Sequence, residues 1–257
     1  MPARHAFRAI APEAAGMPLY RVVKRALLRA IESGQAPPGQ ALPSETELAG
    51  SLGVSIGTLR KAVDELVAEH LLVRRQGRGT FVATHNPDRF LFQYFHVERA
   101  DGLREAPEVD LVSYERHRCE EDAAQALGLR VGDPVVQIEN RLRLQGKAVV
   151  HDRLVLPAAL FKGLSEKRFA EREATIYQLY QSDFGITVVR ALERARAVAA
   201  DRAAARVLGI PLGTPVMQVR RTALTFGDRP VEYRVSTIDT RHHDYVHLLS
   251  RPTSRHE

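Results

Sequence analysis

The sequence has one cysteine and no tryptophan, and it lacks any long apolar run. A single cysteine, Cys119, cannot form a disulfide within the chain, and this usage is typical of proteins in a reducing cytosol. No run of about 18 apolar residues occurs, so we expect no membrane-spanning helix. The N-terminus lacks the continuous apolar segment of a signal peptide. We therefore expect a cytoplasmic protein.

Motifs of enzyme chemistry are also missing. The lone cysteine has no catalytic motif around it, and no nucleophile stands beside a base. Neither a phosphate-cradling glycine loop nor a metal-binding spacing of His and Cys occurs. His242, His243, Asp244 and His247 lie close enough in sequence to suggest a metal, but a solvated polar tail explains them better. We predict no catalytic residue, metal or cofactor.

The charge is positive and unevenly distributed. The net charge is +6, and residues 1–85 contain 11 basic and 7 acidic side chains, which leaves +4 in the first third. A basic excess favours an acidic partner such as nucleic acid, although solubility alone explains a modest excess almost as well. The location of the charge therefore says more than its size.

The first third predicts helices with clear start and stop signals. Apolar residues recur at helical spacing from residue 19 to residue 31. Ser44 followed by Glu47 is the pattern of a capping box, so a second helix begins there. Gly53 suits its left-handed end, and Ser55 suits the N-cap of a third helix. Two short helices joined by a tight glycine turn are typical of a helix-turn-helix.

The third helix and the segment after it are basic. Arg60 and Lys61 lie on the face that the apolar residues of the helix leave free. Residues 72–75 and 79–82 then predict two strands with a Gln-Gly-Arg-Gly tip, which is bordered by further arginines such as Arg78. This order favours a wing beside a recognition helix over a small domain with no partner.

The run PPGQALPSETELAGSLGVSIGTLRKAVDELVAEHLLVRRQGRGTFV closely resembles the DNA-binding domain of the GntR family of bacterial transcriptional regulators. Leu-Pro-Ser-Glu, Leu-Gly-Val-Ser, Thr-x-Arg and Gly-x-Gly-Thr-Phe-Val all stand in register. Ile56, Gly57 and His70 depart from the family pattern, and the first two leave the preferred base sequence open. The resemblance implies a double-stranded DNA operator as partner, contacted by Ser44, Thr46, Ser55, Thr58, Arg60, Lys61, Gly77 and Arg78.

The rest of the chain contains an internal repeat. Residues 121–154 and 201–235 both predict a short helix, a glycine turn and two strands. Two such units are expected to pair their strands into one antiparallel sheet with packed helices, which is an α+β fold. TIYQLYQSDFGI predicts a further helix between them. A constant offset of 81 residues aligns Gly128 with Gly209, Pro134 with Pro215, Gly146 with Gly227 and Arg153 with Arg234.

One strand of the first copy suggests a binding site. Residues 137–144 alternate between a charged and a mostly apolar face, and the second copy lacks the charged pair Arg141 and Arg143. The arginine fork suits a carboxylate or phosphate. A duplicated unit often leaves a cleft where its halves meet. These arginines therefore predict a site for a small anionic effector; the alternative is a solvated outer face.

Residues 90–250 resemble the UTRA effector-binding domain of the HutC branch of the GntR family, which has a chorismate-lyase-like fold. The resemblance is carried by LGLRVGDPV, RLR, TIYQLY, LGIPLGTPV and RPVEY. The segment at 92–107 and the tail after residue 235 depart from relatives that bind sugar phosphates, so that ligand is not transferred. The resemblance implies an effector pocket lined by Arg141, Arg143, Asp152, Thr175, Glu232 and Tyr233.

These observations predict a homodimeric, ligand-responsive repressor that a small anionic metabolite releases from its operator. Replacement of Arg141 by alanine should then abolish ligand-triggered release. The alternative is an enzyme of chorismate-lyase-like fold acting on a small carboxylate or phosphate compound. The operator, the effector and the choice between repression and activation stay open. The predicted segments are a flexible arm (1–17), a winged helix-turn-helix domain (18–84), a linker (85–90), a UTRA domain (91–250) and a tail (251–257).

Overall fold

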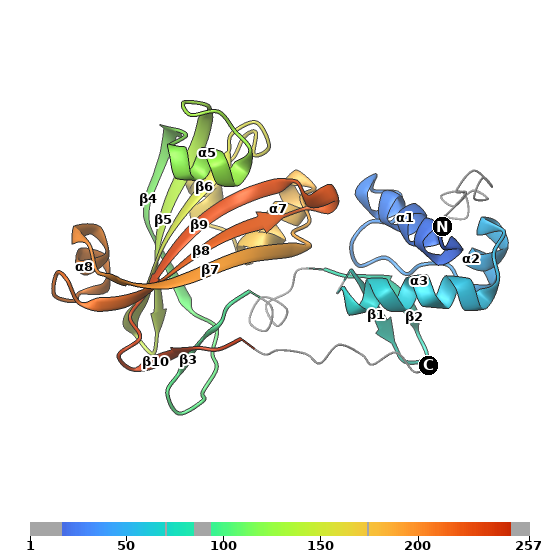
Figure 1. The fold of residues 1–257 in the computed structure, drawn as a ribbon, viewed down its shortest axis with the longest axis horizontal. Coiled ribbons are helices and arrows are strands. Elements are labelled where there is room, and N and C mark those ends of the chain that lie inside the picture. The colour runs from blue at the N-terminus through green and yellow to red at the C-terminus, as the bar shows by residue number, and fades with distance from the viewer. Residues whose placement is uncertain (1–16, 70, 85–93, 174, 248–257) are drawn as a thin grey trace. The chain divides into compact units, whose positions relative to one another are not determined.

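The computed structural model of the chain describes residues 17–69, 71–84, 94–173 and 175–247 (Figure 1). Contacts between residues divide the chain into two compact units, and the boundary between them in the sequence lies between residues 84 and 85. Each unit is described by itself below. Most of the predicted arm, the linker 85–90, the tail 251–257 and His70 lie outside the described residues.

The first unit is a three-helix domain with a β-hairpin, as predicted. Val23, Leu27, Leu52, Leu59 and Leu66 form its core, and each of these side chains is at most 2% exposed. The apolar stripes of the helices therefore face one another, as their sequence period requires. The elements are α1 (Leu19–Glu32), α2 (Glu45–Leu52), α3 (Ile56–Ala68), β1 (Leu72–Arg75) and β2 (Gly79–Val82).

The ends of these helices are set by the predicted caps. The Ser44 hydroxyl accepts a hydrogen bond from the Glu47 backbone N–H, and the Glu47 carboxylate accepts one from the Ser44 N–H, which completes the capping box. Gly53 ends α2 with φ of +68°, and Ser55 caps α3. Since these caps fix where each helix begins and ends, they also fix which side chains occupy the first turn of α3.

The second unit is built on a six-stranded antiparallel sheet, which confirms the α+β class (Figure 1). The strands lie in the order β4-β5-β6-β9-β8-β7, so the two copies of the repeat meet where β6 pairs with β9. The strands are β4 (Glu108–Arg118), β5 (Pro134–Leu144), β6 (Lys147–Pro157), β7 (Arg190–Ala199), β8 (Pro215–Leu224) and β9 (Pro230–Ile238).

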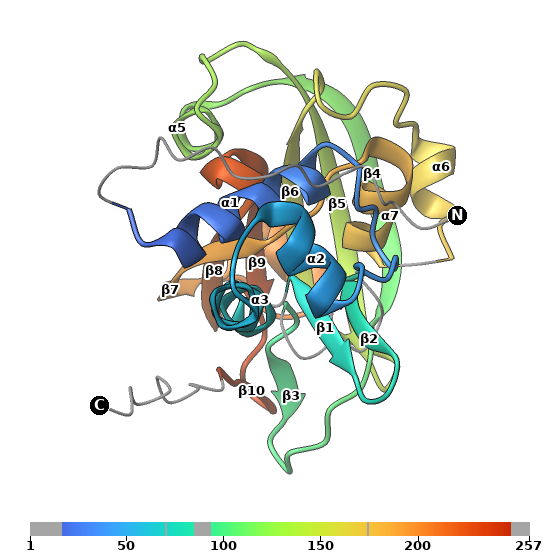
Figure 2. The same ribbon diagram turned by 90° about the vertical axis from the view of Figure 1, so that its right-hand side faces the viewer.

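Helices cover both faces of this sheet (Figure 2). On one face Tyr177 and Tyr180 of α7 are fully buried against Ile138 and Leu154; we call this the α7 face. On the other face Leu127 of α5 packs against Val135 and Val155 of the sheet. Leu208 of α8 packs against Val216, and we call this the α5/α8 face. The helices are α5 (Glu121–Leu127), α6 (Glu166–Ala170), α7 (Ile176–Phe184) and α8 (Arg202–Leu208).

The two copies of the repeat differ by one residue in their hairpins. In the first copy Ile138 lies opposite Leu154, whereas in the second copy Val219 lies opposite Ser236. The offset between copies is therefore 81 residues in the first strand and 82 in the second. The longer turn is η1 (Phe226–Asp228), in which Gly227 has φ of +66°.

This extra residue corrects part of the predicted alignment. A constant offset made Arg153 the equivalent of Arg234, but the strand pairing makes Asp152 its equivalent. Successive side chains of a strand point to opposite faces, so a shift of one residue exchanges the two faces. The predicted alignment of the second strand in each copy is therefore wrong.

A two-stranded sheet that the sequence did not predict covers part of the α7 face. It pairs β3 (Val97–Arg99) with β10 (His243–Tyr245). Val97 packs with Leu142, Val150 and other residues on that face of the large sheet. This small sheet carries side chains from both ends of the second unit to the same part of the α7 face. Among the described residues, no helix is long and apolar enough to cross a membrane.

Candidate DNA-binding surface and effector pocket

The first turn of α3 is polar, exposed and held by its cap. The Ser55 hydroxyl accepts a hydrogen bond from the Thr58 N–H at 3.2 Å and lies 2.9 Å from the Thr58 hydroxyl. Ile56 and Gly57 are exposed beside them. Thr46, on α2, is exposed as well. These groups offer donors, acceptors and an unshielded backbone at the N-terminal end of a helix, which is the part that a helix-turn-helix presents to DNA.

Arg60 of α3 is exposed and forms an ion pair with Glu45 of α2. Its side chain is 62% exposed, and its Nε lies 2.5 Å from Oε2 of Glu45. Arg74 of the wing approaches the other oxygen of the same carboxylate at 3.7 Å. Exposed ion pairs contribute only about 0–1 kcal/mol, so a phosphate or a base edge can replace Glu45 as the partner of Arg60.

Lys61, the other cation of α3, contacts an aromatic ring. Its Nζ lies 4.1 Å from the centre of the Tyr20 ring on α1, which is a cation–π contact. A cation in this geometry is attracted to the ring face, although the side chain remains exposed. Lys61 therefore lies toward α1, whereas Arg60 lies toward α2 and the wing.

The tip of the wing is formed by two glycines in the left-handed region. Gly77 has φ of +69° and Gly79 has φ of +101°. The Arg78 N–H donates to the Arg75 carbonyl at 2.9 Å, which closes the turn. Because Gln76 through Gly79 are all exposed, the backbone and the Arg78 side chain stand open to a partner. The wing is thus basic at its tip.

The structure does not gather the six predicted effector residues around one pocket. Asp152 lies opposite Asn140, and Arg141 lies opposite His151, so Arg141 and Asp152 face different sides of the sheet. Tyr233 belongs to the cluster beneath α5, whereas its neighbour Glu232 points to the α7 face. The expectation that these side chains share one site is therefore wrong.

Arg141 and Arg143 share one acidic partner on the neighbouring strand. Arg141 Nε lies 3.0 Å from Asp110, and Arg143 Nη2 lies 3.2 Å from the same carboxylate and 3.0 Å from Glu108. Both arginines are more than one third exposed, and so they match the solvated strand face that was the alternative interpretation. Thr175 caps α7 by accepting a hydrogen bond from the Gln178 N–H at 3.3 Å.

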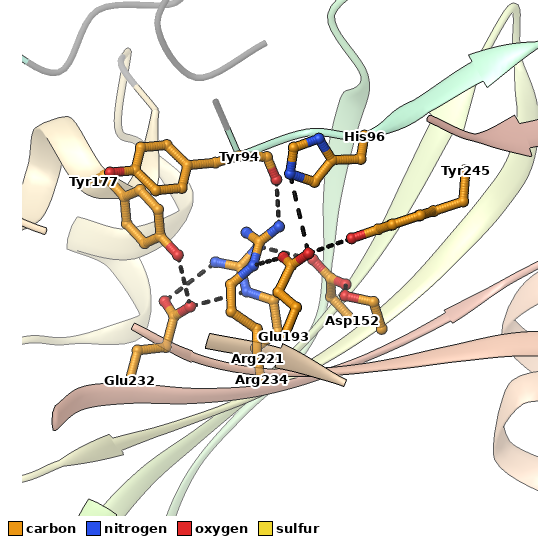
Figure 3. Close-up of polar contacts among 10 residues, drawn as sticks. Tyr94, His96, Asp152, Tyr177, Glu193, Arg221, Glu232, Arg234 and Tyr245 are labelled. Carbon is orange, nitrogen blue, oxygen red and sulfur yellow. Dashed lines mark hydrogen bonds and ion pairs between the residues drawn. The ribbon is translucent and has the colours of Figure 1, made fainter. Parts of the chain in front are cut away.

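Two of the predicted residues do belong to a buried polar cluster on the α7 face (Figure 3). Glu232 is fully buried and receives two hydrogen bonds from Arg234, at 3.0 and 3.1 Å. Tyr177 and Tyr180 of α7 donate to the same carboxylate at 3.1 and 2.7 Å. Arg234 also reaches Asp152 at 3.1 Å. Every oxygen of Glu232 is thus satisfied, so this pair is a rigid support.

A second arginine lies beside the first in the same cluster (Figure 3). Arg221 Nε donates to Glu193 at 2.5 Å, and its Nη2 donates to the backbone carbonyl of Tyr94 at 2.5 Å. The Tyr245 hydroxyl donates to Glu193 as well, and His96 Nε2 lies 4.0 Å from that carboxylate. Tyr94 and His96, which precede β3, and Tyr245 of β10 therefore meet the large sheet through polar contacts.

Burial sets the protonation of this cluster. It lowers the pKa of His96 to about 4, assisted by the nearby Arg221 and opposed by Glu193, so the ring is neutral near pH 7. Burial also raises the pKa of the Tyr177 hydroxyl, and the Glu232 carboxylate raises it further. Both tyrosine hydroxyls of α7 stay protonated and act only as donors to Glu232.

The cluster surrounds a small cavity of about 30 Å³. That volume holds about one or two waters, so a metabolite must displace some of the covering residues to enter. The cavity lies beneath β3 and β10. Its polar lining consists of His96, Asp152, Arg221, Arg234, Ser236 and Tyr245.

A larger groove of about 650 Å³ lies at one end of β4. Its cations are Arg116, Arg118 and Lys162, and all three are exposed. A pocket that orients a small molecule needs a few fixed polar groups in a desolvated place. The small cavity has such groups and the groove does not, so the cavity is the better candidate. Within the described ranges, no three His, Cys, Asp or Glu side chains are placed to hold a metal.

Sequence reasoning missed several residues of the cluster. Arg221 and Arg234 stand in strands that are otherwise largely apolar, and a charge there is a signal of a paired buried group. Glu232, Arg234 and Ser236 also share one parity, which places them on one face. His96 and Tyr245 carried no such signal, because the β3–β10 pairing joins residues far apart in the sequence.

A winged helix-turn-helix joined to a second domain with a buried polar cavity defines a DNA-binding regulator with a ligand-binding domain. The chain matches the family "bacterial regulatory proteins, gntR family" over residues 19–82 and the UTRA domain over residues 103–244. It belongs to the GntR family and carries a UTRA domain.

Proteins of known name support this assignment. The chain is 32% identical to the histidine utilization repressor of Pseudomonas aeruginosa, a match that covers 79% of this chain and 80% of that protein. It is 28% identical to the transcriptional repressor NagR of Bacillus subtilis, over 91% of this chain and 96% of that protein. Relatives of this kind are named transcriptional repressors.

Solved structures agree. The ligand-binding domain of a GntR-family regulator from Bordetella bronchiseptica is 35% identical, with a TM-score of 0.57, and the match covers 60% of this chain and 96% of that one. PhnF from Mycobacterium smegmatis is 26% identical, with a TM-score of 0.52, over 90% of this chain and all of that one. The chain is therefore a DNA-binding transcription regulator with a ligand-responsive domain.

Proposed function

We propose that the protein is a homodimeric repressor that leaves its operator when a small molecule enters the cavity beneath β3 and β10. The α3 helix and the wing would read one half of a near-palindromic operator in each protomer. Arg60 and Arg78 are the cations that we assign to this contact, with Ser44, Thr46, Ser55, Thr58, Lys61 and Gly77 around them. The repressor names of the relatives support the sense of the regulation.

The observation that carries the proposal is the contact between Arg221 and Tyr94. Arg221 lines the cavity, and it donates to the backbone carbonyl of Tyr94. Tyr94 is the first described residue after Thr84, where the DNA-binding unit ends. A ligand that draws the guanidinium of Arg221 away would release this carbonyl. The backbone at Tyr94 would then rearrange.

Such a ligand must bind one state better than the other. Its differential affinity for the two states is the only free energy available to shift them, and a coupling of about 1–3 kcal/mol is typical. The two states would be a closed one, in which β3 and β10 cover a cavity of about 30 Å³, and an opened one. The closed cavity excludes a metabolite, whereas an opened one admits it. DNA binding and ligand binding would thus favour different arrangements of Tyr94.

The first test is selection of bound duplexes from a library of genomic fragments by the purified full-length protein. We expect recovery of one near-palindromic sequence, protected over two half-sites. Replacement of Arg60 by alanine should weaken this selection, whereas replacement of Arg130, an exposed arginine of the second unit, should leave it unchanged. Failure of the protein to retain any duplex at low ionic strength would end the regulatory interpretation.

The second test separates the two faces of the sheet. Asp152→Asn should weaken ligand-triggered release from the operator, because Asp152 lines the cavity. Arg141→Ala should leave release intact if the effector binds on the α7 face. The opposite pattern, with release lost only in Arg141→Ala, would place the effector on the α5/α8 face.

A further inference from the structure

The charges around the cavity are nearly balanced without a ligand. Among the described residues, Arg221 pairs with Glu193 and Arg234 pairs with Glu232. Asp152 is a third carboxylate, and it shares Arg234 with Glu232. Both guanidinium groups of this cluster are thus already paired with carboxylates. The cluster therefore has no spare positive charge to offer an anion.

Asp152, which lines the cavity, lies beside a residue with a spare acceptor. Asp152 is 2% exposed and receives hydrogen bonds from Ser236 at 2.5 Å and from Arg234 at 3.1 Å. Directly opposite it on β5 is Asn140, which is 4% exposed and has a side-chain oxygen without a hydrogen-bond partner. A buried acceptor without a donor is costly, and a carboxylate beside it adds negative charge. Both features call for a cationic donor.

The Arg221 end has groups that suit a carboxylate. The guanidinium of Arg221 lines the cavity and binds Glu193 and the Tyr94 carbonyl, and both of these partners are replaceable acceptors. The Tyr245 hydroxyl already donates to a carboxylate at this place. An incoming carboxylate would find the same donors. It would also take Arg221 from Tyr94, which is the step that the proposed switch needs.

We propose that the effector is an amphoteric small molecule, with a carboxylate for Arg221 and a cationic nitrogen for Asp152 and Asn140. This inference rests on the proposed function, and it replaces the purely anionic effector that the sequence suggested. The ligand adds no net charge to a cluster in which Arg221 and Arg234 are already paired.

A purely anionic ligand meets a clear obstacle in this cluster. It would bring a net negative charge into a buried site where Arg221 and Arg234 are already paired. Any carboxylate that it displaced from Arg221 would be left buried beside it without a counter-ion, and a buried unpaired charge is strongly unfavourable. A purely cationic ligand would satisfy Asp152 but would leave the Arg221–Tyr94 contact untouched.

The test uses matched sets of compounds on the full-length protein. Each set contains an amino acid or an ω-amino carboxylate, its deaminated carboxylic acid and its decarboxylated amine; sugar phosphates form a separate class. Binding raises the midpoint of thermal unfolding, and calorimetry then gives the dissociation constant. We expect stabilisation only by amphoteric members, with the deaminated partner of each binder at least about tenfold weaker, since tenfold corresponds to about 1.4 kcal/mol.

Two variants make the test specific. Asp152→Asn should weaken the amphoteric binder by about tenfold or more, while its affinity for the deaminated partner stays the same. Ser236→Ala is the matched control, because Ser236 also contacts Asp152 but carries no charge. It should keep the preference for the amphoteric compound. The comparison of wild-type affinities requires no variant, so poor folding of Asp152→Asn does not remove the test.

The outcomes distinguish this inference from the proposed function. If a sugar phosphate or a deaminated acid binds as tightly as the amphoteric compounds and releases the operator, the regulator stands and the ligand class is wrong. The inference is equally overturned if no compound of any class stabilises the protein. If amphoteric compounds bind but never affect operator binding, the ligand class stands and the regulatory proposal fails.

Discussion

The two units of the protein use arginine–carboxylate pairs in opposite ways. In the first unit the Arg60–Glu45 pair is exposed, and its partners are held by weak, solvent-screened attraction. In the second unit the Arg234–Glu232 pair is buried and fully hydrogen-bonded. An exposed pair leaves its arginine free to exchange partners, whereas a buried pair fixes a geometry. The same chemistry therefore leaves an accessible arginine in one unit and a fixed buried framework in the other.

The largest effect that tests this comparison is expected for Arg234→Met. The substitution leaves Glu232 and Asp152 buried without their shared cation, and breaking a buried pair in this way costs about 3–5 kcal/mol. Urea unfolding of the second unit should show this loss in the free energy of unfolding. Arg130→Met, at a side chain that is 91% exposed, should change it by less than about 0.5 kcal/mol. A loss below about 1 kcal/mol for Arg234→Met would contradict the comparison.

A smaller effect is expected from the titration of His96. Its pKa is about 4 in the folded chain and 6.5 as an ordinary histidine, so the unfolded chain binds the proton first as pH falls. The contribution of His96 to stability is therefore complete above pH 6.5 and is lost as pH falls toward 4, by up to about 3 kcal/mol. Besides Glu193 and Arg221, the titratable groups that act on His96 are Arg104 and His247.

The check is the pH dependence of the free energy of unfolding in wild type and in His96→Gln. The difference between the two curves removes the acid titration of the carboxylates that both proteins share. We expect this difference to change between pH 6.5 and 4 and to be flat above that range. A flat difference throughout would mean that His96 is accessible to protons in the folded protein.

At the surface of the first unit, Arg60→Ala should lower operator affinity by about 1–3 kcal/mol if Arg60 reads a base. The free energy of unfolding should change little, because the pair with Glu45 is exposed. Competition among operator variants provides the measurement. An even loss of affinity for every sequence would instead make Arg60 a phosphate contact.

The smallest effect is expected for Arg141→Ala. The Arg141 side chain is 43% exposed in its pair with Asp110. Its removal should therefore lower the free energy of unfolding by no more than about 1 kcal/mol. We also expect an unchanged affinity for any compound that stabilises the wild type. A large loss of ligand affinity in this variant would move the binding site away from the cavity beneath β3 and β10.

Much of the first unit could be predicted from the sequence because its signals are local. The Ser44 capping box, the Gly53 end of α2 and the Ser55 cap each depend on residues within one helical turn. The two wing strands were bounded by glycines at the tip, and the structure has them at the predicted residues. The sequence also predicted the duplicated sheet, since the glycine and proline turns repeat.

The arrangement of the second site could not be predicted for two physical reasons. One extra residue in the second hairpin exchanges the faces of β9, and a constant offset hides it. The β3–β10 pairing joins residues about 145 positions apart, and no local pattern predicts such a contact. As a result the sequence does not predict the cavity that Arg221, Arg234 and His96 line.

The longer η1 turn has a consequence for how receptors of this kind can diversify. A duplicated sheet begins with two equivalent inner surfaces, and a lengthened turn gives one of them a new set of side chains without disturbing the other. The first copy here keeps Ile138 and Leu154 as packing for α7. The second copy places Arg221, Arg234 and Ser236 at the cavity, while the first copy contributes Asp152.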